Sequence, residues 1–104
     1  MKTDKKTRLE KAGFRVGSAA ELLNLSSEET TLVNMRLALA GAVRERRATL
    51  GFSQTELARR LGSSQSRIAK LEAGESNVSI DLLVRAMLAT GAKPREIGVA
   101  IAAG

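Results

Sequence analysis

The chain has 104 residues, which is enough for one small domain with a single hydrophobic core. It contains no cysteine and no histidine, which excludes disulfides and thiol nucleophiles and removes the commonest general base and metal ligand. Its 17 Lys and Arg residues against 11 Asp and Glu give a net charge of +6, and this surplus favours an anionic partner such as nucleic acid, an acidic protein or a membrane surface.

Residues 1–16, "MKTDKKTRLEKAGFRV", contain six basic and two acidic residues. This composition predicts a flexible basic tail before a single folded domain at residues 17–104. The tail is either a solvated arm or an arm that contacts DNA phosphates or folds onto a partner. Because it lacks the apolar core of a signal peptide, and because no apolar run approaches the ~20 residues of a membrane span, we expect a cytoplasmic protein with no membrane partner.

Two helices are predicted in the first half of the chain. "SAAELLNL" predicts a short helix with Ser18 as its N-cap and Glu21 completing a capping box. A long helix is expected from Ser27 to Leu50, capped by the serine at 26 or 27 and ended by Gly51. Apolar residues recur along it at helical spacing and predict its buried stripe: Leu32, Met35, Leu39, Val43 and Leu50.

Serine, proline and glycine residues divide the second half into four shorter helices. The helices are expected at about 54–61, 65–73 and 80–90, with a last one opening at Pro94 in "PREIGVAIA". The sequence shows no alternating strand pattern of useful length, so it predicts an all-α fold.

The stretch "SQTELARRLGSSQSRIAKLEAG" (residues 53–74) predicts a helix-turn-helix. Two helices joined by a short glycine-containing turn need a small residue where they cross and a turn residue that tolerates positive φ. Ala58 and Gly62 meet these needs, and both helices carry inward apolar anchors: Leu57, Leu61, Ile68 and Leu71.

With "LGFSQTELARRLGSSQSRIAKLEAG" followed by "SIDLLVRAML", residues 44–90 resemble the lambda-repressor/Cro-like helix-turn-helix, the XRE family of bacterial and phage regulators. The resemblance implies a five-helix DNA-binding domain, here with an extra N-terminal helix and the basic tail. It also implies a transcriptional regulator, expected to be a repressor, that binds double-stranded DNA as a homodimer at a near-palindromic operator.

In this family the second motif helix enters the major groove with its N-terminal residues on base edges. Gln65 can pair bidentately with adenine, and Lys70 can donate to guanine. Their alternative is that they are ordinary solvent-facing residues of a capped helix. The expected base-reading set is Ser64, Gln65, Ser66, Arg67 and Lys70.

The resemblance further implies that Gln54, at the start of the first motif helix, clamps a phosphate together with free backbone N–H groups. The other candidates for phosphate contact are Ser53, Ser76, Asn77 and Arg59. Alternatively, Ser53 is only a helix cap and Arg59 is only part of a solvent-exposed face. The negative charge of Glu75 would repel a phosphate, which disfavours the contact at residues 76 and 77.

Arg47 and Glu72 are expected, from the same resemblance, to form a partly buried ion pair that joins the long helix to the second motif helix. Such a pair fixes the relative position of its two helices more than it stabilises the fold, because the cost of desolvating the two charges offsets their attraction. We therefore expect loss of Glu72 to impair folding and not base choice.

A looser resemblance gives a second functional hypothesis. The frame "AELLNLSSEETTLVNMRLALAGAVRERR" with "LVRAMLATGAKPREIGVAI" looks like HigA-like antitoxins, which bind a ribonuclease toxin and repress their own operon. Residues 1–35 would then cover the toxin.

The dimer surface is expected on the last two helices, with an intramolecular core as the alternative role of the same residues: Met87, Leu88, Ile97, Val99 and Ile101. An enzyme is not expected, since a Ser66/Lys70 pair on an exposed helix has no pocket and no orienting group. No catalytic residue, metal site or cofactor is predicted.

Overall fold

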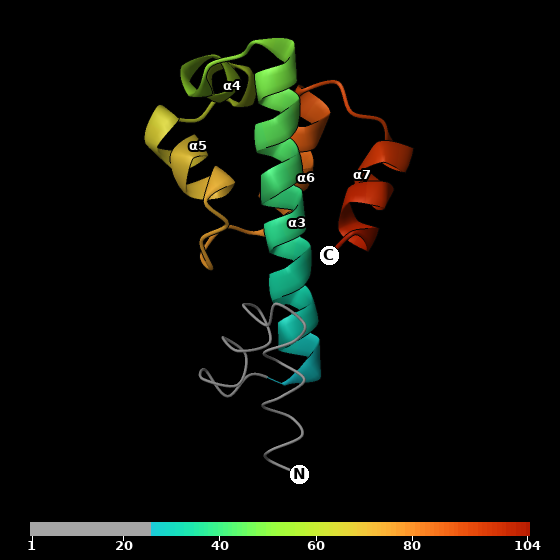
Figure 1. Cartoon of the computed structure of the whole chain (residues 1–104). Coiled ribbons are helices and arrows are strands. Elements are labelled where there is room, and N and C mark those ends of the chain that lie inside the picture. The colour runs from blue at the N-terminus through green and yellow to red at the C-terminus, as the bar shows by residue number, and fades with distance from the viewer. Residues whose placement is uncertain (1–25) are drawn as a thin grey trace. The chain divides into compact units, whose positions relative to one another are not determined.

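A computed structural model describes residues 26–104, and these residues form five α-helices and no strand (Figure 1). The helices are α3 (Ser27–Leu50), α4 (Gln54–Leu61), α5 (Gln65–Glu72), α6 (Ile80–Ala89) and α7 (Pro94–Ala102). The expected all-α fold is thus confirmed, and each expected helix in this range is present with ends within a residue of the expected ones. The basic tail at 1–16 and the short helix expected at 18–25 lie outside the described residues.

Residues 26–34, which begin α3, belong to a different compact unit from residues 35–104, so the two are described separately. In the first unit Ser26 and Glu29 form a reciprocal capping box. The Ser26 Oγ accepts from the Glu29 backbone N–H at 3.1 Å, and the Glu29 carboxylate accepts from the Ser26 N–H at 2.8 Å. The second of these bonds holds the pKa of Glu29 below its ordinary value. The start of α3 is therefore specified by its own first residues.

The starts of α4, α5 and α6 follow the serine pattern expected from the sequence. The hydroxyls of Ser53, Ser64 and Ser79 each accept a hydrogen bond from a backbone N–H of the first helical turn. At α7, which opens with Pro94, the Glu96 carboxylate accepts from the Lys93 backbone N–H at 2.7 Å. Each of these bonds satisfies one of the amides that a helix start leaves unpaired.

Every helix of residues 35–104 contributes to one hydrophobic core. Leu39 and Val43 of α3 are fully buried, but Leu32 near its start and Leu50 at its end are 45% and 48% exposed. The buried stripe of α3 is therefore shorter at both ends than the apolar spacing predicts. The fully buried large side chains of the core are Leu39, Val43, Leu57, Ile68, Leu71, Leu83 and Met87.

Figure 1 shows α5 and α7 on opposite sides of α3. Arg46 on α3 fixes the turn that leads into α7. Its guanidinium donates to the buried Thr90 at the side-chain hydroxyl (2.8 Å) and at the backbone carbonyl (3.2 Å), and it pairs with Glu96 at 3.4 Å. Ile97 then buries the inner face of α7 in the core.

Two glycines set the geometry around α5. Gly62 and Gly74 have φ of +66° and +71°, in the left-handed region that side-chain-bearing residues adopt at a cost. A Cβ atom at Gly62 would meet no atom within 4 Å, whereas one at Gly74 would lie 2.7 Å from Leu37 Cδ2. Gly74 therefore carries a steric constraint in addition to the conformational one.

We expect Gly62→Ala to lower the free energy of unfolding by about 1–2 kcal/mol, the cost of left-handed backbone. Gly74→Ala should cost more than that, because the Leu37 side chain must also move. Urea denaturation of both variants measures the difference, and adding Leu37→Ala to each isolates the contact. Equal losses for the two glycine variants would contradict the role of Leu37.

Candidate nucleic-acid interface

The turn between α4 and α5 is short because Gly62 reverses the chain directly after α4. The Gly62 N–H donates to the Arg59 carbonyl at 3.2 Å, and the Ser63 N–H donates to the Ala58 carbonyl at 2.8 Å. Ala58 is buried, as expected for a small residue in the helix-turn-helix. These two backbone bonds fix the end of α4 and the direction in which the chain leaves it towards α5.

The helix α5 has one buried and one exposed face. Ile68, Leu71 and Glu72 are buried, whereas Gln65, Ser66, Arg67 and Lys70 are exposed. All five residues expected to read bases, Ser64 included, are exposed in this structure.

Two hydroxyls at the start of α5 are already engaged with each other. The Ser64 Oγ accepts from the Arg67 backbone N–H at 3.3 Å and lies 3.3 Å from the Ser66 Oγ. The longer side chains exposed on this face are those of Gln65, Arg67 and Lys70.

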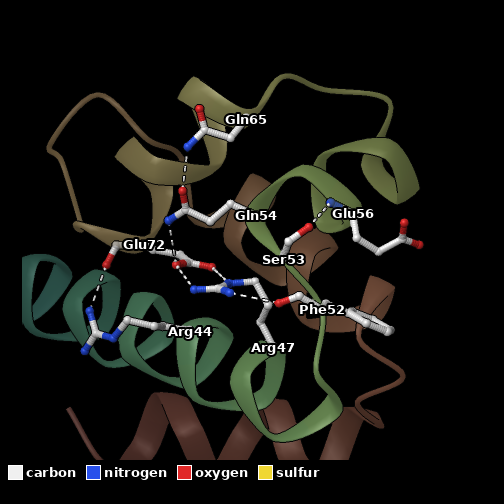
Figure 2. A network of polar contacts seen from close by, with 8 residues as sticks. All are labelled: Arg44, Arg47, Phe52, Ser53, Gln54, Glu56, Gln65 and Glu72. Atoms are coloured by element: carbon white, nitrogen blue, oxygen red, sulfur yellow. Dashed lines mark hydrogen bonds and ion pairs between the residues drawn. The ribbon is translucent and has the colours of Figure 1, made fainter.

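Arg47 and Glu72 form a bidentate ion pair that joins α3 to α5 (Figure 2). The Arg47 Nε and Nη2 donate to the two carboxylate oxygens at 2.5 and 2.9 Å, and Nη1 donates to the Phe52 carbonyl at 2.9 Å. Glu72 is only 4% exposed, and its hydrogen bond with Arg47 raises the pKa of the guanidinium. Arg44 adds a bond from Nη1 to the Glu72 backbone carbonyl at 3.2 Å.

Gln54 links this ion pair to Gln65, as Figure 2 shows. The Gln54 Nε2 donates to the Glu72 Oε1 at 3.1 Å, and the Gln65 Nε2 donates to the Gln54 Oε1 at 2.6 Å. Sequence reasoning assigned Gln54 to a phosphate and Gln65 to a base, and it missed the bond between them. The available signal was that the only two glutamines of the chain are the first residues of the two motif helices.

Arg59 and Ser53, two of the phosphate candidates, are occupied within α4. Arg59 donates to both carboxylate oxygens of Glu56, at 3.1 and 2.6 Å, and this pairing lowers the pKa of Glu56. Arg60 also donates to Glu56 at 2.9 Å, and its guanidinium lies 4.1 Å from the Phe52 ring centre. The Ser53 hydroxyl serves as the α4 cap. Arg59 would have to release the Glu56 carboxylate before its guanidinium could bind a DNA phosphate.

The other two phosphate candidates, Ser76 and Asn77, are exposed in the loop after α5. Arg36 on α3 holds this loop, because its Nε donates to the Val78 carbonyl at 3.0 Å. Asn77 lines a hollow of about 130 Å³ together with Arg67 and Lys70. The structure therefore brings Asn77 beside two cations of α5, through an arginine contact that the sequence did not reveal.

Residues 26–104 hold no group of three or more acidic side chains placed to bind a metal ion. No helix within that range is both long enough and apolar enough to cross a membrane.

The chain belongs to the helix-turn-helix family. Residues 43–97, more than half of its 104 residues, match the helix-turn-helix family model HTH_3, which covers XRE-type regulators. Comparison with curated proteins and with solved structures gave no match. The family supports a DNA-binding regulatory protein of lambda-repressor-like fold, and it is not a family of enzymes.

We expect Glu72→Ala to lower the free energy of unfolding by roughly 3 kcal/mol, because it leaves the Arg47 guanidinium partly buried without its partner. Glu75→Ala removes the same charge from an exposed position of the same segment and should change stability by no more than about 0.5 kcal/mol. Chemical denaturation of the two variants checks the comparison. Similar stabilities would contradict a structural role for the ion pair.

Proposed function

We propose that this chain is a dimeric transcriptional repressor that reads a two-fold symmetric operator with α5 in the major groove. The observation that supports it best is the exposed face of α5. Gln65, Arg67 and Lys70 are exposed on that face, and neither of the two cations forms an ion pair with another residue of 26–104. An amide and two cations are the groups that pair with adenine and guanine edges.

Phosphate contacts on either side of α5 complete the proposed docking. The α4 N-terminus offers backbone N–H groups next to Gln54, and Asn77 lies beside Arg67 and Lys70. We assign positioning on the backbone to these groups and base choice to Gln65 and Lys70, with Ser66 and Arg67 contributing next. Ser64 acts mainly as the cap that holds this end of α5 in place.

The proposed dimer surface lies on α6 and α7. Of the five residues expected there, Met87 and Ile97 are buried in the core, while Leu88 and Val99 are 51% and 66% exposed. Ile101 is partly buried against the core. Met87 and Ile97 therefore belong to the core. The dimer proposal rests on the exposed Leu88 and Val99, with Ile101 as a smaller, partly buried contribution.

The antitoxin alternative assigns a ribonuclease toxin to residues 1–35. Most of that segment lies outside the described residues, and no contact in residues 26–104 favours a toxin. We therefore propose the repressor role and do not carry the alternative further.

Selection from a random duplex DNA pool tests base recognition, with the wild type and Gln65→Ala run in parallel. The wild type should enrich a two-fold symmetric motif. Gln65→Ala should bind the best site more weakly by roughly 1–3 kcal/mol and lose its preference at one base pair of each half-site. A wild-type selection without an enriched motif, or a motif unchanged by the substitution, would contradict the proposed function.

We expect Leu88→Glu and Val99→Glu, singly and together, to shift the protein towards monomer in analytical ultracentrifugation. A carboxylate in an apolar interface loses its hydration without a partner. Affinity for a full operator should fall, while affinity for a half-site should stay the same. Thr55→Glu places the same charge on the exposed surface of α4 and should leave the oligomeric state unchanged. A dimer that survives the double substitution would place the interface elsewhere.

A further inference from the structure

One tight turn lies in the loop between α5 and α6. The Glu75 N–H donates to the Lys70 carbonyl at 3.3 Å, and the Val78 N–H donates to the Glu75 carbonyl at 3.0 Å. Ser76 and Asn77 are therefore the central residues of a hydrogen-bonded turn, and both are exposed. The bond to Lys70 attaches the first residue of this turn to α5. The position of the turn relative to α5 then depends on what holds its last residue, Val78.

Arg36 of α3 holds that last residue. Val78 is 7% exposed and belongs to the hydrophobic core. Its carbonyl lies outside the hydrogen-bond ladder of α6, which begins with the bond from the Leu83 N–H to the Ser79 carbonyl. A carbonyl at a buried position needs a partner, and the Arg36 Nε donates to it at 3.0 Å. The turn that carries Asn77 is thus attached to α5 at one end and to α3 at the other.

The place of this turn matters because it brings Asn77 beside two cations of α5. Asn77 lines the hollow of about 130 Å³ together with Arg67 and Lys70, and Val78 and Leu82 also contribute to its lining. Neither cation forms an ion pair with another residue of 26–104. Cationic groups and an amide N–H are donors that phosphate oxygens accept. The amide can share a phosphate with a cation only if the turn keeps it within hydrogen-bond reach.

The geometry points to Arg36 as a positioning residue for DNA binding. By holding the Val78 carbonyl, Arg36 keeps the Asn77 amide beside the cations of α5, where it donates to a phosphate of the DNA backbone. This inference rests on the proposed function, which assigns a phosphate contact to Asn77. It adds the residue of α3 on which that contact depends, and for which sequence analysis predicted no role. Arg36 acts through Asn77 and does not itself contact DNA.

Two substitutions of Arg36 separate its hydrogen bond from its charge. Arg36→Gln places an amide nitrogen as many bonds from the backbone as the arginine Nε, so it retains a donor for the Val78 carbonyl without the charge. Arg36→Met has similar length and has neither the donor nor the charge. Both variants have the same net charge, so a difference in DNA affinity between them reports the hydrogen bond. Arg95→Gln and Arg95→Met make the same changes at an exposed position of α7 and serve as controls.

Fluorescence anisotropy measures the affinity of each variant for a duplex that carries the motif selected by the wild type and for a duplex of scrambled sequence. Arg36→Met should bind both duplexes about 5- to 10-fold more weakly than Arg36→Gln, the effect of losing one hydrogen bond to a charged group. The two Arg95 variants should bind equally. Because phosphate contacts carry no sequence information, the motif selected by each Arg36 variant should be that of the wild type.

Asn77→Ala tests the route through which Arg36 acts. Alone, it should weaken binding to both duplexes by about 10-fold, and as a change at an exposed residue it should leave the fold intact. Combined with Asn77→Ala, Arg36→Gln and Arg36→Met should bind DNA equally, because the contact that Arg36 positions is already lost. A role of Arg36 in stability alone would leave their difference unchanged. Thermal midpoints show that each variant is folded at the temperature of the binding measurement.

Three results would overturn the inference: equal affinities of Arg36→Gln and Arg36→Met, a difference between them that persists with Asn77→Ala, or full affinity of Asn77→Ala alone. If both Arg36 variants are weakened equally and the slope of log affinity against log salt falls by about 1, Arg36 itself contacts a phosphate. The proposed function is judged separately, by the selection with the wild type and Gln65→Ala. The scrambled duplex lets the Arg36 comparison be made whether or not a motif is enriched.

Discussion

The bidentate pair between Arg47 and Glu72 is the interaction on which the arrangement of the described helices depends. It joins three parts of the chain, because Arg47 lies on α3, Glu72 lies on α5, and the remaining Arg47 donor holds the Phe52 carbonyl just before α4. Burying a carboxylate to this extent is costly unless it is paired with an opposite charge and hydrogen-bonded. The geometry is therefore demanding, and a small shift of α5 would leave a charge without partners.

A third hydrogen bond to that carboxylate comes from α4. Gln54 donates to the oxygen that the Arg47 Nη2 also contacts, so the buried charge is satisfied by groups from α3 and α4 together. The other end of the same amide holds Gln65 on the exposed face of α5. One polar network thus extends from the core to the surface proposed to meet DNA, and residues that position the helices also hold the side chain of Gln65.

Local chemistry made most of the fold predictable from the sequence. Ser53, Ser64 and Ser79 mark helix starts because the capping bond involves only neighbouring residues, and a glycine with positive φ follows α3, α4, α5 and α6 at the expected places. Apolar spacing was less informative. It identified Leu39 and Val43 as core residues, but the exposure of Leu50 depends on where the neighbouring helices end.

The polar network was predictable only in part. The ion pair followed from a family resemblance, whereas the link through Gln54 depends on the rotamers of two amides and on the separation between α4 and α5. Neither quantity is encoded in the spacing of residues. The same holds for Met87 and Leu88, which are adjacent on α6 yet lie respectively in the core and on the surface, since only the packed structure shows which side of α6 is covered.

Two neighbouring arginines of α3 connect the proposed DNA-reading and dimer surfaces. Successive residues of a helix point about 100° apart, and Arg46 and Arg47 accordingly reach different elements. Arg47 holds α5, while Arg46 holds Thr90 at the end of α6 and Glu96 in the first turn of α7. In the proposed dimer the separation of the two α5 helices is then set through one turn of α3, by hydrogen bonds that are partly buried on both sides. Half-sites at a fixed spacing require this kind of rigid connection, because a flexible joint between the two surfaces would let the α5 helices lose register with the DNA helical repeat.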